Sequence, residues 1–185
     1  EIGIPICEDI WEKDVCEDLK KQGCDLLISP NGSPFDKYKI DQRKKIITER
    51  VSETETALIY VNQVGGQDEL VFDGNSLAIN PNKEFAFEAP AWEESLNILE
   101  FDEKSKVLVT QSSKKEKCSD IENIYLATVI GLRDYVEKNS FPGVILGLSG
   151  GIDSALCAAI AVDALGEERV SSFMLPSIYT SDESF

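Results

Sequence analysis

The sequence predicts an α/β protein with two domains, each organised around parallel strands that helices connect. Three observations support this fold class. Apolar strand patterns and amphipathic helix patterns alternate in residues 1–64, they alternate again in residues 121–176, and the stretch between them is rich in β-forming residues and turn signals. With 185 residues, the chain can hold one complete hydrophobic core or parts of two.

The first domain is predicted to span residues 1–111. Its first helix has Val15 and Leu19 four positions apart, and its β-rich stretch contains the turn signals Asp73-Gly74 and Pro81-Asn82, which predict antiparallel hairpins. In chain order, the predicted elements are a strand over 1–7, a helix over 14–21, a strand over 24–30, a helix over 39–55, and strands over 57–64, 96–101 and 106–110.

A polar segment without periodicity, residues 112–120, is predicted to link this domain to a second one over residues 121–185. The predicted elements of the second domain are a helix over 121–138, a strand over 143–149, a helix over 153–165 and a strand over 169–176.

Composition excludes several classes of partner and mechanism. The chain has 34 acidic and 18 basic residues, a formal charge of −16, which disfavours nucleic acid and anionic membrane surfaces as partners. No stretch reaches the roughly 18 apolar residues of a membrane span. The absence of histidine excludes a Ser-His-Asp or Cys-His mechanism from this chain alone. Five cysteines without a CxxC pair indicate a reducing, cytoplasmic compartment.

A glycine-rich loop joins the strand and the helix of the second domain. The segment Gly147–Ser154, GLSGGIDS, combines glycines, serines and a helix N-terminus, which together form an anion site. Ile152 and Asp153 stand where a Walker loop has its lysine, so the loop belongs to another class. Asp153 suggests a role in Mg²⁺ coordination, although a plain turn with a helix-start carboxylate is the alternative.

This loop resembles the pyrophosphate-binding loop of the N-type ATP pyrophosphatases, which cleave ATP to AMP and pyrophosphate while they adenylate a carbonyl oxygen. The segment MLPSIYTSDES over 174–184 is similar to NAD synthetases in particular. The resemblance implies that ATP is bound by Gly147, Leu148, Ser149, Gly150, Gly151, Ile152, Asp153, Ser154 and Met174, and that Asp153 is a Mg²⁺ ligand.

Cys7 follows an apolar stretch, in the segment GIPICEDIW. A free cysteine is usually a buried packing residue, which is the alternative interpretation. The segment nevertheless resembles the nucleophile region of the nitrilase superfamily, in which a glutamate and a lysine activate the cysteine without any histidine. That resemblance implies that the Cys7 thiolate attacks a carboxamide, that ammonia leaves, and that water hydrolyses the thioester.

Two further segments resemble the glutaminase domain of glutamine-dependent NAD synthetases: SPNGSPFDKYK over 29–39 and IYVNQVGGQDELVFDGNS over 59–76. The resemblance implies that Ser33 and Lys39 contact glutamine. Taken alone, Ser33 is equally compatible with a turn cap and Lys39 with an exposed lysine at a helix start.

The combined resemblance implies the C-terminal part of a nitrilase-like αββα sandwich, followed by the start of a doubly wound, Rossmann-like ATP pyrophosphatase domain. We therefore expect a fragment of a ligase that makes NAD⁺ from deamido-NAD⁺, ATP and glutamine, acts with Mg²⁺ and forms homo-oligomers. The base and lysine of the glutaminase are expected upstream of residue 1 and the deamido-NAD⁺ contacts beyond residue 185, so the fragment is expected to be inactive. The charged residues near the presumed nucleophile do not match these roles: Glu8, Asp9, Lys13 and Lys21.

Two alternatives remain open at this stage. One is a carbon–nitrogen hydrolase of the nitrilase superfamily with an unrelated nucleotide-binding C-terminal domain. The other is a nucleotide-binding regulatory protein with an inactive amidase remnant. Pyrophosphate release that depends on deamido-NAD⁺ distinguishes the ligase from the first, and labelling of Cys7 by a glutamine-like electrophile distinguishes it from the second.

Overall fold

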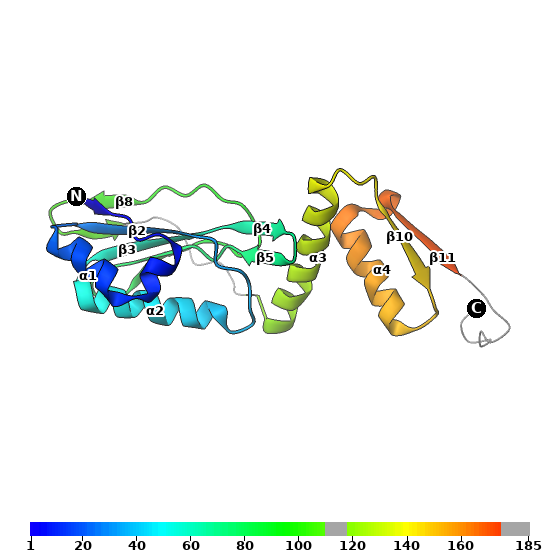
Figure 1. Ribbon diagram of the computed structural model, residues 1–185, viewed down its shortest axis with the longest axis horizontal. Helices are drawn as coiled ribbons and strands as arrows, with labels where there is room; N and C mark the ends of the chain where they lie inside the picture. Colours follow the sequence, from blue (N-terminus) through cyan, green and yellow to red (C-terminus); the bar gives the residue numbers. More distant parts are fainter. Residues whose placement is uncertain (110–117, 175–185) are drawn as a thin grey trace. The chain divides into compact units, whose positions relative to one another are not determined.

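The computed structural model describes residues 1–109 and 118–174, and the chain divides into two units (Figure 1). The first unit consists of residues 1–65 and 72–120, and the second of residues 66–71 and 121–185. Most of the predicted linker, and the predicted motif after Met174, lie outside the described residues.

The first unit contains a five-stranded sheet with the strand order β1, β2, β3, β6, β7. These strands are β1 (Ile2–Gly3), β2 (Leu26–Asn31), β3 (Ala57–Asn62), β6 (Leu77–Ile79) and β7 (Phe85–Glu88). The first three are parallel, with Leu26 opposite Ala57, and β6 and β7 are antiparallel to their neighbours. Parallel neighbours require crossover connections, which two helices supply. The predicted α/β class is confirmed.

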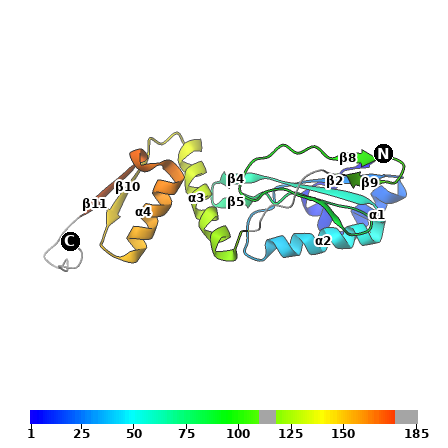
Figure 2. The same cartoon turned by 180° about the vertical axis from the view of Figure 1, so that it is seen from behind.

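Both faces of this sheet are covered, and the alternation of side chains along the strands decides which residue faces which layer. The helices are η1 (Cys7–Trp11), α1 (Lys13–Lys21) and α2 (Lys39–Thr54), and Figures 1 and 2 both show α1 and α2 on one side of the sheet. Leu27 and Leu58 belong to the core cluster that contains buried side chains of these helices. Leu26 and Ala57 instead pack in a second cluster with Leu108.

Two predicted β features of the first unit, one at its start and one near its middle, differ from the structure. The strand expected over 1–7 is only β1, because the chain turns into η1 at Cys7. The Asp73-Gly74 signal does not make a hairpin: β4 (Val64–Gln67) pairs with β5 (Leu70–Asp73), and the chain then passes through Gly74 to β6. Gly74 has φ +67°, and a Cβ there would lie 2.8 Å from the Val64 side chain, so the position requires glycine.

The Pro81-Asn82 signal does mark the turn between β6 and β7, as predicted. The last two strands of the unit, β8 (Glu100–Asp102) and β9 (Val107–Val109), form an antiparallel pair. Both begin later than predicted, at Glu100 rather than residue 96 and at Val107 rather than residue 106. Leu96 and Ile98 were predicted to lie in this first strand, but they precede β8 and are almost fully exposed.

The second unit contains a βαβ arrangement preceded by a long helix. Its elements are α3 (Asp120–Lys138), β10 (Val144–Leu148), α4 (Ile152–Leu165), η2 (Glu167–Arg169) and β11 (Val170–Met174). Strands β10 and β11 are parallel, with Leu148 opposite Met174. The two helices and two strands are those predicted from periodicity. Within the described residues, no helix is both long enough and apolar enough to cross a membrane.

The tip of the β4–β5 ribbon, residues 66–71, lies against α3 in this unit. The Gly66 N–H donates to Asp134 Oδ2 at 2.6 Å, and Lys138 Nζ donates to the Gly66 carbonyl. A Cβ at Gly66 would lie 3.2 Å from the Gly131 Cα, so the two backbones approach closely here. This contact was not predicted from sequence, because it joins residues far apart in the chain.

Candidate amide-hydrolysing and ATP-binding sites

Cys7 stands at a sharp bend between β1 and α1. Its φ is +51°, in the left-handed region that costs a non-glycine residue about 1–3 kcal/mol and that clusters at functional sites. Asp9 stabilises the bend, because its carboxylate accepts the Ile6 N–H at 2.9 Å and its own N–H donates to the Ile6 carbonyl at 3.1 Å. The thiol is half-buried.

A cavity of about 450 Å³ opens at this bend. Three residues predicted to act together, Cys7, Ser33 and Lys39, all line it. They come from the start of η1, the loop after β2 and the start of α2. The carboxyl ends of parallel strands commonly form such sites. The remaining lining residues are Glu8, Trp11, Glu12, Asn31, Gly32 and Pro34.

Trp11 forms one wall of this cavity and binds the Lys39 side chain. The Lys39 ammonium lies 4.5 Å from the centroid of the Trp11 ring, a cation–π contact. The contact fixes where the Lys39 charge lies relative to the cavity. Sequence reasoning did not find Trp11, since a tryptophan in a short helix usually packs against a core and gives no signal of its own.

Ser33 is 7% exposed and is held from two sides by side chains distant in sequence. Asn62 accepts the Ser33 N–H at 2.9 Å and donates to the Ser33 carbonyl at 3.1 Å. Arg43 donates to Ser33 Oγ at 3.0 Å and to the Ser33 carbonyl at 2.7 Å. The loop that lines the cavity is therefore fixed by buried polar groups rather than by regular secondary structure.

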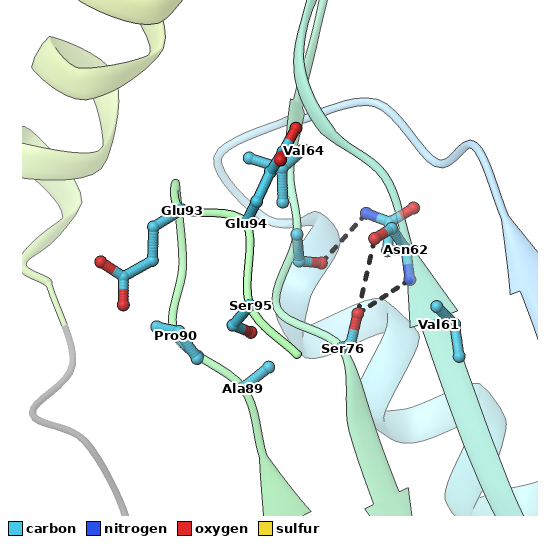
Figure 3. Close-up of a pocket in the computed structure, with 10 residues that line it drawn as sticks. Val61, Asn62, Val64, Ser76, Ala89, Pro90, Glu93, Glu94 and Ser95 are labelled. Atoms are coloured by element: carbon cyan, nitrogen blue, oxygen red, sulfur yellow. Dashed lines mark hydrogen bonds between the residues drawn. The ribbon is translucent and has the colours of Figure 1, made fainter. Parts of the chain in front are cut away.

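Asn62 lines a second cavity, of about 200 Å³ (Figure 3). The Asn62 backbone N–H donates to Ser76 Oγ at 2.9 Å, and its side-chain amide donates to the Gly74 carbonyl at 3.1 Å. The other lining residues come from β3, from β4 and mostly from the segment after β7: Val61, Val64, Ala89, Pro90, Glu93, Glu94 and Ser95. Asn62 is thus shared between the wall of this cavity and the loop that carries Ser33.

The glycine-rich loop of the second unit lies between β10 and α4, as predicted. Gly150 has φ +81°, and Gly151 is the N-cap residue of α4. The Ser154 hydroxyl donates to the Gly151 carbonyl at 2.9 Å and lies 3.2 Å from Ser149 Oγ. Hydroxyls therefore brace the loop internally. A Cβ at Gly147 would meet nothing within 4 Å, so the strand end is open.

Asp153 and Met174 both lie at the end of the βαβ unit that this loop occupies. Asp153 is exposed in the first turn of α4, and Met174, opposite Leu148 in the parallel pair, is 43% exposed. No group of three or more acidic, cysteine or histidine side chains is placed to hold a metal among the described residues. A single carboxylate nevertheless fits Mg²⁺ that arrives with a nucleotide, because phosphate oxygens and water supply its other ligands.

Comparison with known families decides what these two sites belong to. The model of the carbon-nitrogen hydrolase family matches residues 1–107, more than half of the chain. The chain belongs to the carbon-nitrogen hydrolase family. A second model, NAD synthase, matches residues 124–185 of this carbon-nitrogen hydrolase chain.

Individual relatives confirm the resemblance to glutamine-dependent NAD synthetases. The chain is 45% identical to the glutamine-dependent NAD(+) synthetase of Rhodobacter capsulatus over 99% of its length and 33% of the relative, and 43% identical to that of Acinetobacter baylyi over 100% and 34%. It therefore spans about a third of the length of these relatives.

Two solved structures agree with the fold of this carbon-nitrogen hydrolase chain. The glutamine-dependent NAD⁺ synthetase of Acinetobacter baumannii, in complex with ADP, superposes with a TM-score of 0.92 at 45% identity, over 99% of this chain and 35% of that one. The glutamine-dependent NAD(+) synthetase of Cytophaga hutchinsonii gives 0.72 at 20% identity, over 99% and 35%, and shows the fold alone. The predicted combination of a nitrilase-like fold and the start of a synthetase domain is confirmed.

Proposed function

We propose that this chain is part of a glutamine-hydrolysing NAD⁺ synthetase, in which the first unit releases ammonia from glutamine and the second activates deamido-NAD⁺ with ATP. The observation that carries the proposal is that Cys7, Ser33 and Lys39, named from three separate motifs, line one cavity. The order of the two family matches along the chain supports it.

In the proposed glutaminase reaction, the Cys7 thiolate attacks the carboxamide carbon of glutamine, the C–N bond breaks and ammonia leaves with an added proton. Water then hydrolyses the thioester to glutamate and regenerates the thiol. Ser33 and the Lys39 ammonium would hold the polar groups on the α-carbon of glutamine at the cavity wall. We assign the general base and the oxyanion lysine to no residue of this chain, so the proposal concerns the whole protein.

In the proposed adenylation, the loop from Gly147 to Ser154 would bind the ATP phosphates through backbone N–H groups and the N-terminus of α4. Asp153 would help hold the Mg²⁺ that accompanies the nucleotide, which offsets phosphate charge. Met174, beside the strand end, would contact the adenine. The carboxylate of deamido-NAD⁺ would attack the α-phosphorus of ATP, and pyrophosphate would leave. Ammonia would then attack the adenylated carboxylate, with AMP leaving.

The remaining expectations are proposals of the same kind. We place the domain boundary at residues 112–120, with a glutaminase domain over 1–111 and a synthetase domain over 121–185. The substrates are small molecules, namely glutamine, ATP and deamido-NAD⁺, and the assembly is a cytoplasmic homo-oligomer.

The test uses a full-length protein that contains this sequence, assayed with glutamine or with ammonium. Cys7→Ala should abolish NAD⁺ formation from glutamine and spare formation from ammonium, whereas Asp153→Ala should stop both. Cys157→Ala, which removes an exposed thiol on α4, and Asp163→Asn on the same helix serve as controls and should change neither. Loss of both activities in Cys7→Ala, or of neither, contradicts the proposal.

A further measurement distinguishes the synthetase from a carbon–nitrogen hydrolase that has another nucleotide-binding function. Pyrophosphate release should require deamido-NAD⁺. If glutamine hydrolysis occurs while pyrophosphate release does not depend on deamido-NAD⁺, the protein is a carbon–nitrogen hydrolase with another nucleotide-binding function.

A further inference from the structure

We propose that Arg43, held in place by Asp73, is a positioning residue that orients the Ser33 hydroxyl as a hydrogen-bond donor to glutamine in the Cys7 cavity. The inference rests on the proposed function, since it takes glutamine as the ligand of Ser33. Neither Arg43 nor Asp73 lines the cavity, so the effect passes through Ser33.

All three nitrogens of the Arg43 guanidinium are used. Nε donates to Ser33 Oγ at 3.0 Å, and Nη2 donates to the carbonyls of Ser33 and Pro34 at 2.7 and 2.9 Å. Nη1 donates to both carboxylate oxygens of Asp73, at 2.8 and 3.0 Å. Arg43 reaches this position from the buried face of α2, and Asp73 from the end of β5.

The direction of one of these bonds decides the chemistry of Ser33. A guanidinium can only donate, so Ser33 Oγ must accept from Arg43 Nε. One lone pair of the hydroxyl is thereby occupied, and its proton is directed away from the guanidinium. The adjacent positive charge also strengthens the hydroxyl as a donor. Burial raises the pKa of Tyr60 and a hydrogen bond from Ser33 opposes that rise, so the Tyr60 hydroxyl is an acceptor beside this proton. An acceptor oxygen of glutamine, either of the α-carboxylate or of the carboxamide, would take its place.

Burial explains why the pair must be Arg with Asp. Arg43 is 2% exposed and Asp73 is fully buried, and a buried charge is tolerated only when it is paired and hydrogen-bonded. Asn75 Nδ2 donates to Asp73 Oδ2 at 2.6 Å, so the carboxylate is satisfied on its other side. A lysine at position 43 could pair with Asp73 but has no planar fork to reach Ser33 Oγ and the two carbonyls together.

Asn62 allows the orientation of the Ser33 hydroxyl to be tested separately from the conformation of the loop that carries Ser33. Its amide holds both the N–H and the carbonyl of Ser33, independently of Arg43. In Arg43→Lys, we therefore expect the Ser33 backbone to stay in place while the hydroxyl loses its fixed orientation.

The experiment measures KM for glutamine, kcat and ammonium-supported activity in the full-length protein for Ser33→Ala, Arg43→Lys and the double variant. Each single variant should raise the glutamine KM by about tenfold, the size expected for one charge-assisted hydrogen bond, with ammonium-supported activity unchanged. The double variant should be no worse than Ser33→Ala alone, because Arg43 acts through Ser33. Effects that multiply to about a hundredfold overturn the proposal, as does an unchanged KM in Arg43→Lys.

Arg50→Lys is the matched control. Arg50 lies on the same helix, is 6% exposed and pairs with Glu53, but has no contact with Ser33. It should lower stability without changing the glutamine KM, and an equal rise in KM would show that Arg43 acts only through helix packing. If Arg43→Lys yields no soluble protein, Asp73→Asn replaces it, with the same non-additivity with Ser33→Ala expected and additivity contradicting the proposal.

The two proposals fail in distinguishable ways. If the wild-type protein shows no Cys7-dependent use of glutamine, the proposed function fails. If Ser33→Ala raises the glutamine KM and Arg43→Lys does not, the proposed function stands and the positioning role of Arg43 is wrong.

Discussion

Asn62→Asp replaces one nitrogen with oxygen in the side chain that holds the Ser33 loop. The substitution tests how far the conformation of this loop depends on buried hydrogen bonds. The variant keeps an oxygen to accept the Ser33 N–H, which now lies 2.9 Å from Asn62 Oδ1. It loses both donors of Nδ2, which lies 3.1 Å from the Ser33 carbonyl and 3.1 Å from the Gly74 carbonyl. The new oxygen faces two carbonyl oxygens instead.

The magnitude follows from the burial of this site, since Asn62 is 7% exposed. The Gly74 carbonyl is left without its donor, whereas the Ser33 carbonyl keeps the bond from Arg43 Nη2 at 2.7 Å but faces the new oxygen. At about 1–2 kcal/mol for each of the two lost hydrogen bonds, we expect the free energy of unfolding of the first unit to fall by about 2–4 kcal/mol at pH 8. This loss is large compared with the total free energy of unfolding of a typical domain, which is about 5–15 kcal/mol.

Lower pH should partly restore stability. Burial and the two carbonyl oxygens raise the pKa of the introduced carboxyl in the folded state above its unfolded value, so its charged form is what destabilises the fold. The Arg43 guanidinium, which also bonds to the Ser33 carbonyl, opposes this rise only in part because Asp73 already balances its charge. As pH falls through the folded-state pKa, the carboxyl gains a proton that can donate to one carbonyl. The deficit relative to wild type should therefore be smaller at pH 5 than at pH 8.

Urea unfolding followed by tryptophan fluorescence measures this effect, because both tryptophans, Trp11 and Trp92, lie in the first unit. The midpoint should fall by about 1–2 M urea at pH 8. Asn97→Asp is the matched control, since Asn97 is exposed and its side-chain amide donates to the Ser95 hydroxyl at 2.8 Å. A shift for Asn62→Asp as small as that for Asn97→Asp, or one that grows as the pH is lowered, would refute the reasoning.

Three further predictions concern thiol reactivity and glycine positions. Burial raises the pKa of the Cys16 thiol to about 11. At pH 8, iodoacetamide should therefore label Cys16 about a hundredfold more slowly than the exposed Cys157, as measured by mass spectrometry. Equal labelling rates would contradict this prediction. Gly66→Ala places a Cβ 3.2 Å from the α3 backbone and should lower the thermal midpoint of the second unit in calorimetry, by an amount equivalent to about 1–2 kcal/mol. Gly150 has φ +81°, so Gly150→Ala should lower the stability of the second unit by about 1 kcal/mol in the same measurement. Gly147→Ala, whose Cβ would meet nothing within 4 Å, should leave the stability unchanged. Equal effects of the two substitutions would show that the loop conformation is not what requires glycine.

Periodicity was sufficient to predict the α-helices and the longer parallel strands, whereas β1 is shorter than predicted and η1 was not predicted. The helix α2 begins at Lys39 and ends within one residue of its predicted end, and the βαβ unit around the glycine-rich loop was predicted in full. These elements have local causes, namely apolar spacing and glycine or proline boundaries. The residues predicted to surround Cys7 also lie together, because their motifs sit at strand ends and helix starts that the topology brings to one edge.

Interactions between distant residues could not be predicted in the same way. Nothing in the local pattern of α2 marks Arg43, which looks like one of several surface charges until Asp73 and Ser33 are placed beside it. The left-handed backbone of Cys7 is equally invisible, since a short apolar stretch before a cysteine is most simply a longer strand. In both cases, the tertiary environment overrides local preference.

The segment 59–76 illustrates why a motif can be recognised before its purpose is visible. At one end, Asn62 holds the Ser33 backbone, and at the other, Asp73 holds the arginine that bonds to the Ser33 hydroxyl. Its middle, at Gly66, lies so close to α3 that a Cβ there would be 3.2 Å from the Gly131 Cα. None of these residues lines the Cys7 cavity, yet two of them determine how Ser33 is presented there. If glutamine is the substrate, substitutions at Asn62 and Asp73 should therefore change its KM through Ser33, although neither residue lines the cavity.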